Sequence, residues 1–252
     1  MDLTVLGSCG TWPGAGRATS GYLVRHDGHA LWVDAGTGTF AELQRHLALA
    51  EVDAILVTHE HLDHIADLLA VAYAIAYGGL APEGFPVHLP SGVLGHLEGA
   101  VGEGTREKLR AAFDVHAVEA GTREIGPFAV EAVPMPHAGL AAFGYRIAAG
   151  GAMLAYTGDT GPGDGAVARL GAGADVLLAE AALLETDPVP ALDLHLTAAQ
   201  AAEGAAAAGA SRLVLTHIRP DRDPAVSVRE AGRRYDGPIG VAEEGTTMEV
   251  RA

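Results

Sequence analysis

Cysteine and lysine are nearly absent from this chain of 252 residues. Cys9 is the single cysteine, which excludes a disulfide within the chain and any metal site built from several cysteines. Lys108 is the single lysine, and acidic residues outnumber basic ones 32 to 16, giving a formal net charge of −16. A surface this acidic disfavours unspecific binding to nucleic acids and to anionic membranes.

Long apolar runs are also missing. The longest, Leu68 to Tyr77, has half of the roughly 20 residues that cross a bilayer, and the N-terminus has no basic start followed by an apolar stretch. We therefore expect a cytoplasmic protein without a membrane partner. Hydrophobic residues make up 49% and charged residues 19%, which is typical of a folded globular protein. No repeat or linker interrupts the chain, so we expect one domain over residues 1–252.

Short apolar strands alternate with helices. Strands are predicted at Leu3–Leu6, Gly21–Arg25, Ala30–Asp34, Ala54–Thr58, Pro127–Val133, Phe143–Ala148, Ala152–Thr157, Val176–Glu180 and Arg212–Thr216, and within Ile239–Val250. Helices are predicted from Thr39 to about Ala50, from Asp63 to Tyr77, from Thr197 to Gly209 and from Pro224 to Tyr235. Capping boxes begin the first and third of these helices.

The strands come both as hairpins and as strand–helix units, so we expect an α/β fold with mixed sheets. Two packed sheets with helices outside would bury this much apolar strand, although periodicity alone also allows a single doubly wound sheet. The segment Gly78–Gly104 is rich in glycine and proline and gives no clear element. It is a candidate for a lid or for the interface of a homodimer. Trp12, Trp32, Tyr73 and Tyr77 are interpreted as packing residues.

Four potential metal ligands are crowded into six residues: His59, His61, Asp63 and His64. A random match to this pattern is expected roughly once in six hundred chains of this length and composition. Alternate residues of an extended segment share a face, so the first three point the same way and the fourth points differently, which suits two metal ions. Imidazole and carboxylate together suit zinc, manganese or iron.

Three more potential ligands each end a predicted strand: His137, Asp159 and His217. The ends of strands at one edge of a sheet converge, so these residues could complete a site for two divalent ions. Asp34 is predicted to support the loop behind the metals, and Cys9 to be a small buried filler.

The order of these seven residues, with Val33-Asp34-Ala35-Gly36 ahead of them, resembles the metallo-β-lactamase-fold hydrolases. The resemblance covers nearly the whole chain. It implies a four-layer αββα sandwich of two mixed sheets flanked by helices. It also implies that His59, His61 and His137 bind one metal, that Asp63, His64 and His217 bind the other, and that Asp159 bridges them.

The C-terminal half resembles the ribonuclease Z-like branch in Glu180-Ala181, in His195-Leu196-Thr197-Ala198-Ala199-Gln200 and in Leu215-Thr216-His217. In that branch the histidine that matches His195 is catalytic and the glutamate that matches Glu180 supports it. A carboxylate partner would fix the tautomer of His195 and favour its protonated form.

The chain departs from the RNA-processing members of that branch. The lysine and asparagine of their N-terminal loop are missing from Pro13-Gly14-Ala15-Gly16-Arg17-Ala18, and the interval from His137 to Asp159 has little room for an RNA-binding arm. Together with the net charge, these departures make transfer RNA a less favoured partner. A closer resemblance is to actinobacterial atypical class II cyclic-nucleotide phosphodiesterases, which implies a small phosphodiester such as 3′,5′-cyclic AMP. The pieces that match are Ser20-Gly21-Tyr22-Leu23-Val24-Arg25, Leu43-Gln44-Arg45-His46, Phe113-Asp114-Val115-His116, Asp193-Leu194-His195-Leu196 and Leu215-Thr216-His217-Ile218.

The hypothesis is therefore a hydrolase in which two metal ions activate water, Asp63 orients it, and His195 with Glu180 assists the leaving oxygen. Arg17, Arg219 and Arg222 are candidates for contacts with the substrate phosphate. The alternatives are processing of RNA 3′ ends, a lactonase, and a non-catalytic nucleotide-binding protein.

Overall fold

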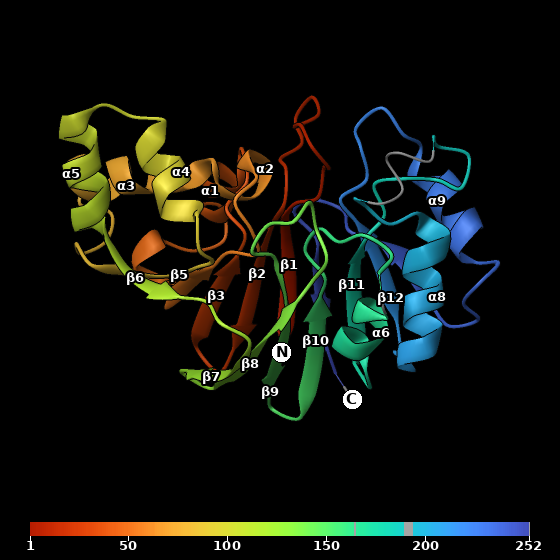
Figure 1. Cartoon of the computed structure of the whole chain (residues 1–252). Coiled ribbons are helices and arrows are strands. Elements are labelled where there is room, and N and C mark those ends of the chain that lie inside the picture. Colours follow the sequence, from red (N-terminus) through yellow and green to blue (C-terminus); the bar gives the residue numbers. More distant parts are fainter. Residues whose placement is uncertain (164, 189–193, 252) are drawn as a thin grey trace.

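The computed structural model describes residues 1–163, 165–188 and 194–251, which form two seven-stranded sheets packed face to face (Figure 1). The first sheet has the order β14-β1-β2-β3-β4-β5-β6. Its strands are β1 (Asp2–Gly7), β2 (Gly21–His26), β3 (His29–Val33), β4 (Ala54–Leu56), β5 (Phe85–Leu89), β6 (Phe113–Ala117) and β14 (Thr247–Glu249). The second has the order β13-β12-β11-β10-β9-β8-β7. Its strands are β7 (Gly121–Ile125), β8 (Phe128–Pro134), β9 (Phe143–Ala149), β10 (Ala152–Tyr156), β11 (Val176–Glu180), β12 (Leu213–Thr216) and β13 (Ile239–Val241).

Both sheets are mixed. In the first, β14, β1, β2 and β3 pair antiparallel, and β3 to β6 pair parallel. In the second, β7 to β10 pair antiparallel, and β10 to β13 pair parallel. The parallel strands need crossovers, and helices supply several of them. The expected sandwich of two mixed sheets is confirmed.

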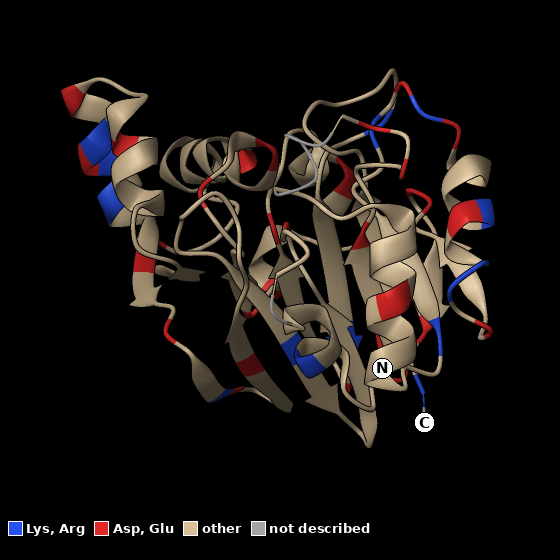
Figure 2. Cartoon of the chain, turned by 45° about the vertical axis from the view of Figure 1, so that its right-hand side comes forward, with Lys and Arg blue, Asp and Glu red and all other residues tan. Residues whose placement is uncertain are grey.

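Helices cover the outer face of each sheet (Figure 1). The first sheet carries α1 (Thr39–Leu43), a 3₁₀ turn η1 (Leu49–Glu51), α2 (Leu62–Ile65), α3 (Asp67–Gly78), α4 (Val93–Gly99) and α5 (Glu103–Ala112). The second carries α6 (Ala166–Gly171), α8 (Ala198–Ala208) and α9 (Pro224–Ala231). Among the described residues, no helix is both long enough and apolar enough to cross a bilayer. Figure 2 shows acidic residues on many outer loops and helices and a group of basic residues on α5.

Successive apolar side chains along a strand face opposite sides of its sheet. In β2 and β3, Tyr22, Val24 and Leu31 face the second sheet, whereas Leu23 and Trp32 face the helices. A third apolar layer lies between the second sheet and α6, α8 and α9. Each fully buried aliphatic or aromatic side chain contributes about 1.5–3 kcal/mol to the stability of the fold. The sandwich therefore has one core between its sheets and one under each helical layer.

Several predicted boundaries were wrong. The helix predicted from Thr39 to Ala50 ends at Leu43, and its N-cap is Gly38, so the capping box at Thr39 does not form. The Thr39 hydroxyl instead donates to the Gly36 carbonyl at 2.7 Å. The helix predicted from Asp63 to Tyr77 is divided at Ala66 into α2 and α3.

Other predicted elements agree with the structure or fall partly outside its description. The capping box at Thr197 is present and begins α8. The Gly78–Gly104 segment, which gave no prediction, contains β5, α4 and the start of α5. Part of the loop predicted at 187–190, and Asp193, lie outside the described residues.

Gly36, just after β3, packs closely against the predicted metal-binding segment. A Cβ atom at Gly36 would lie 2.0 Å from the Asp63 carbonyl oxygen and 2.3 Å from the Thr19 hydroxyl. Backbone bonds hold this approach, because Ser20 donates to the Asp63 carbonyl and Ala35 donates to the His64 carbonyl. The backbone next to β2 and β3 is therefore in direct contact with the backbone of α2.

We predict that Gly36→Ala lowers the free energy of unfolding by about 1–3 kcal/mol or more, because overpacking displaces backbone rather than a flexible side chain. Gly95→Ala is the matched control, since a Cβ there meets nothing within 4 Å and alanine favours helix α4. Denaturant unfolding of both variants measures the difference. Equal stabilities of Gly36→Ala and the native protein would contradict this account of the packing.

Candidate metal centre

The predicted ligands come together at one edge of the sandwich. His59 follows β4, His137 follows β8, Asp159 follows β10 and His217 follows β12, so all four lie just beyond the ends of strands. The remaining three, on or next to the short helix α2, complete the set: His61, Asp63 and His64. These seven residues form two groups that share Asp159, and in each group the ligand atoms lie within 4.8 Å of one another.

The first group contains His59, His61, His137 and Asp159. The Nδ1 atom of His61 lies 3.1 Å from Nε2 of His59 and 3.1 Å from Nε2 of His137. The Oδ2 atom of Asp159 lies 3.7 Å from Nε2 of His59 and 4.0 Å from Nε2 of His137. Three imidazole nitrogens and one carboxylate oxygen therefore surround one point.

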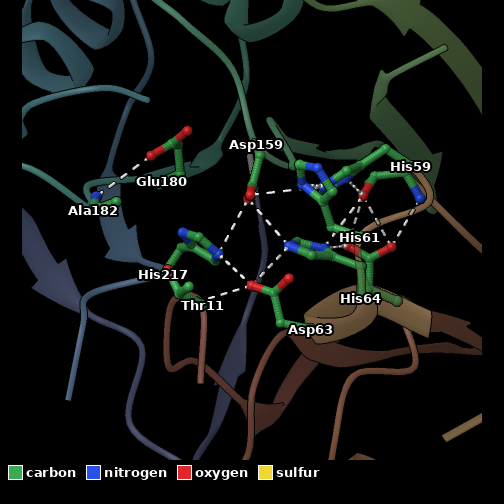
Figure 3. Close-up of polar contacts among 12 residues, drawn as sticks. Thr11, His59, His61, Asp63, His64, Asp159, Glu180, Ala182 and His217 are labelled. Carbon is green, nitrogen blue, oxygen red and sulfur yellow. Dashed lines mark hydrogen bonds and ion pairs between the residues drawn. The ribbon is translucent and has the colours of Figure 1, made fainter. Parts of the chain in front are cut away.

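The second group contains Asp63, His64, Asp159 and His217. Here the other oxygen of Asp159, Oδ1, lies 3.2 Å from Nε2 of His64 and 3.4 Å from Nε2 of His217. Nε2 of His217 also lies 3.1 Å from Oδ2 of Asp63. Figure 3 shows Asp159 between the side chains of the two groups. The Asp159 carboxylate thus presents one oxygen to each group.

A second layer of polar groups fixes the imidazole rings. Nδ1 of His64 lies 2.7 Å from Oδ2 of Asp34, Nδ1 of His59 lies 3.0 Å from the Thr58 hydroxyl, and Nδ1 of His137 lies 2.9 Å from the carbonyl of Leu194. Using Nδ1 in these outer contacts leaves Nε2 of each ring directed into the site. Asp34 is itself held by the Thr58 amide at 2.8 Å and the Tyr156 hydroxyl at 2.9 Å. Asp34 thus lies behind the predicted ligands and supports them, as predicted.

The chemistry of this donor set fits divalent cations. Nε2 of His64 and Oδ1 of Asp159 are buried and have no hydrogen-bond partner among the described residues, although they face each other at 3.2 Å. Burial would lower the pKa of His64, but the carboxylates of Asp159, Asp34 and Asp63 outweigh burial and raise that pKa well above its ordinary value, so positive charge is favoured at this point. A divalent ion among the same oxygens would supply that charge and leave Nε2 free to act as a ligand. Imidazole with carboxylate suits zinc, manganese and iron, and the two groups are consistent with a binuclear site.

Burial and neighbouring charges together set the pKa values of His59 and Asp159. Burial lowers the pKa of His59 well below its ordinary value, and the neighbouring imidazoles lower it further. Burial by itself would raise the pKa of Asp159, but the imidazoles around it outweigh burial and hold that pKa well below its usual range. Asp159 is therefore ionised and His59 neutral, which are the forms that bind a metal ion.

His195 and Glu180 form a pair beside the two groups. Glu180, at the end of β11, is fully buried and its Oε1 accepts from the Thr160 amide at 2.8 Å and lies 3.0 Å from Nδ1 of His195. Burial would lower the pKa of His195, but the Glu180 carboxylate outweighs burial and raises it to about 9. The His195 ring lies 5.2 Å from the ring of His137 and 5.5 Å from that of His217. The structure brings both predicted residues to the site.

Two of the three arginines that were predicted to contact phosphate already pair with carboxylates. Arg219 pairs with Asp221 at 2.6 Å and Arg222 pairs with Asp187 at 2.7 Å, so both guanidinium groups already face carboxylates. Arg17 lines a surface cavity together with Glu42 and Glu244. A role of these arginines in binding phosphate stays a prediction.

Sequence reasoning missed two backbone groups that contact the predicted ligands. The backbone amide of Thr11 donates to Oδ2 of Asp63 at 2.9 Å, with Thr11 at a positive φ of 67°, and the Leu194 carbonyl accepts from His137. Backbone groups carry no signal in residue types, so neither could be found from the sequence. Trp12 is 41% exposed and is not the packing residue that was predicted, whereas Trp32 is fully buried. Cys9 is buried, as expected for a filler, and burial raises the pKa of its thiol.

Comparison with known proteins places this architecture. A family model described as "Beta-lactamase superfamily domain" matches residues 19–218. The uncharacterized protein Rv1339 of Mycobacterium tuberculosis is 35% identical over 258 residues, covering 100% of this chain and 93% of that protein. Ribonuclease Z of Haloferax volcanii is 28% identical over 305 residues, covering 99% of this chain and 95% of that protein.

A solved structure agrees with the sequence matches. The metallo-β-lactamase fold protein YhfI from Bacillus subtilis has a TM-score of 0.86 and 24% identity, with 98% of each chain covered. The fold, the family match over 19–218 and the two groups of histidine and aspartate ligands agree with one another. This chain belongs to the metallo-β-lactamase superfamily of metal-dependent hydrolases.

Proposed function

We propose that this protein is a metal-dependent phosphodiesterase that hydrolyses a small cyclic nucleotide such as 3′,5′-cyclic AMP. The observation that carries the proposal is the His195–Glu180 pair, 3.0 Å apart, at the side of the two ligand groups. Hydrolysis of a phosphodiester expels an alkoxide, which leaves more readily when an acid protonates it. The Glu180 carboxylate raises the pKa of His195 to about 9, which favours the protonated form that an acid needs.

The proposed metal assignment uses the two groups directly. His59, His61 and His137 would hold one divalent ion, Asp63, His64 and His217 the other, and Asp159 would bridge them through its two oxygens. When bound, the ions would supply charge neutralisation and activation of water. Zinc or manganese suits these donors, and iron is compatible.

His195, Glu180 and Asp63 each have a separate role in the proposed reaction. His195 uses Nδ1 for Glu180, so Nε2 carries the proton that passes to the 3′-oxygen as the P–O3′ bond breaks. The water oxygen bonds to phosphorus, and the proton that this water loses goes to solvent. The buried Glu180 carboxylate keeps the ring in one orientation and favours its charged form. The described contacts of Asp63 with Thr11 and His217 both use Oδ2, so Oδ1 is left to orient the attacking water.

Two observations favour a small substrate over a folded RNA. The chain between His137 and Asp159 consists of little more than β9 and β10, joined by a tight turn at Gly150-Gly151, and provides no projecting arm. The net charge of −16 opposes binding of a polyanion, whose affinity depends on many cationic contacts. A small nucleotide carries little charge and needs few such contacts.

The second candidate is processing of RNA 3′ ends. Its support is the identity of 28% to a protein named ribonuclease Z, over 99% of this chain. That alignment spans 305 residues, more than the 252 residues of this chain, so the relative has additional residues. A transfer-RNA precursor with a 3′ extension is the substrate that would distinguish this candidate.

We expect hydrolysis of 3′,5′-cyclic AMP to 5′-AMP when Mn²⁺ or Zn²⁺ is supplied, and its loss in Asp63→Ala, because Asp63 would both bind metal and orient water. The measurement is product formation by chromatography with each metal separately. Asp53→Ala is the matched control, since Asp53 pairs with His29 outside the site. A protein that holds two ions but leaves cyclic AMP intact, while cleaving precursor RNA or a lactone, would contradict the assignment of the substrate.

We also expect His195→Ala to lower turnover about 10²- to 10⁴-fold, the usual contribution of a positioned acid, while metal content stays at the native value. Glu180→Gln should lower turnover less, because the ring keeps a hydrogen-bond partner but loses the charge that favours its protonation. Steady-state kinetics and elemental analysis of the same samples separate the two effects. If His195→Ala loses metal in proportion to activity, then His195 is a ligand and its role as acid is wrong.

A further inference from the structure

The loop between β1 and β2 is attached to the candidate metal centre along its backbone. Thr11 donates to Oδ2 of Asp63 at 2.9 Å, and Gly10 donates to the carbonyl of Ile218 at 3.3 Å. A Cβ atom at Gly10 would lie 2.3 Å from the carbonyl oxygen of His217, so this approach needs glycine. Trp12 follows directly, and is therefore held beside the Asp63 and His217 side of the site.

The exposure of Trp12 has no explanation in packing. Its side chain is 41% exposed, whereas the other tryptophan, Trp32, is fully buried in the core under α1. Two further exposed apolar residues adjoin site residues in the sequence: Leu62, between two predicted ligands, and Leu194, whose carbonyl binds His137. Exposed apolar side chains on the segments that carry a polar site favour a substrate that has an apolar or aromatic part.

Arg219 holds the indole from one side. Its guanidinium lies 5.2 Å from the centre of the Trp12 ring. Nε and Nη2 of Arg219 both donate to the Asp221 carboxylate, at 3.1 and 2.6 Å, which fixes the plane of the guanidinium. A cation over one face orients the ring and leaves stacking to the other face. Because Asp221 already balances its charge, Arg219 is better suited to this role than to binding phosphate.

We propose that Trp12, supported by Arg219, is the stacking surface for the nucleobase of the substrate. This inference rests on the proposed phosphodiesterase function and adds that the substrate is a nucleotide recognised through its base. Stacking of a base on an aromatic side chain tolerates any base, so Trp12 selects nucleotides over other phosphodiesters without choosing among bases. The contact is equally present in bound substrate and transition state, so it acts on KM and leaves kcat unchanged.

A binding measurement tests the inference without turnover. Since Trp32 is buried, a ligand that stacks at the surface changes the fluorescence of Trp12 alone. We expect saturable quenching by 5′-AMP in the metal-loaded protein and none by ribose 5-phosphate, which has the same phosphate but no base. Trp12→Leu should abolish the response to 5′-AMP, and an unchanged response in this variant would overturn the inference.

Kinetics provide the second readout. Trp12→Leu should raise KM for cyclic AMP about tenfold or more with kcat within twofold, and Trp12→Phe should recover much of the loss. Tyr77→Leu is the matched control: Tyr77 is 66% exposed and lies under Lys108 at 4.7 Å, but belongs to α3 at the far side of the molecule from α8 (Figure 1). An unchanged KM in Trp12→Leu would refute the stacking role and leave the phosphodiesterase assignment intact. Quenching by 5′-AMP that needs Trp12, in a protein that leaves cyclic AMP uncleaved, would retain the base site and refute the proposed reaction.

Discussion

Buried imidazole and carboxylate groups are crowded at one edge of the sandwich, and their mutual placement is favourable only with positive charge among them. Asp159 is the centre of this constraint, because its two oxygens face two different sets of histidines at 3.2–4.0 Å. The ends of β4, β8, β10 and β12, together with α2, deliver the ligands from segments far apart in the chain. The sandwich thus holds the ends of several strands at fixed positions around the Asp159 carboxylate.

The core between the two sheets extends to the residues that support the predicted ligands. Tyr22 and Tyr156 pack with ring centres 4.8 Å apart, and their hydroxyls contact Thr216 at 2.5 Å and Asp34 at 2.9 Å. Asp34, at a positive φ of 59°, then orients His64. Burial raises the pKa of both tyrosines, so they remain neutral donors. The interactions that bury the sheets therefore also orient His64, one of the predicted ligands.

The sequence predicted which side chains gather at this edge because their signal lies in residue type and spacing: imidazoles and carboxylates two residues apart, or directly after an apolar strand. Strands with glycine turns, such as the hairpin at Gly150-Gly151, were equally readable. Between Gly78 and Gly104 the glycines and prolines obscured β5 and α4. The helix predicted from Thr39 ends at Leu43, and Gly38 rather than Thr39 is its N-cap. The Thr11 amide and the exposure of Trp12 depend on tertiary contacts, which no local pattern reports.

Anomalous X-ray diffraction from crystals loaded with zinc or manganese tests the central claim most directly. The account predicts two peaks at the absorption edge of the metal. One should lie among His59, His61 and His137, the other among Asp63, His64 and His217, with an Asp159 oxygen beside each. A single peak, a pair of peaks that does not share Asp159, or a metal held elsewhere in the chain would contradict the binuclear centre and the hydrolytic mechanism built on it.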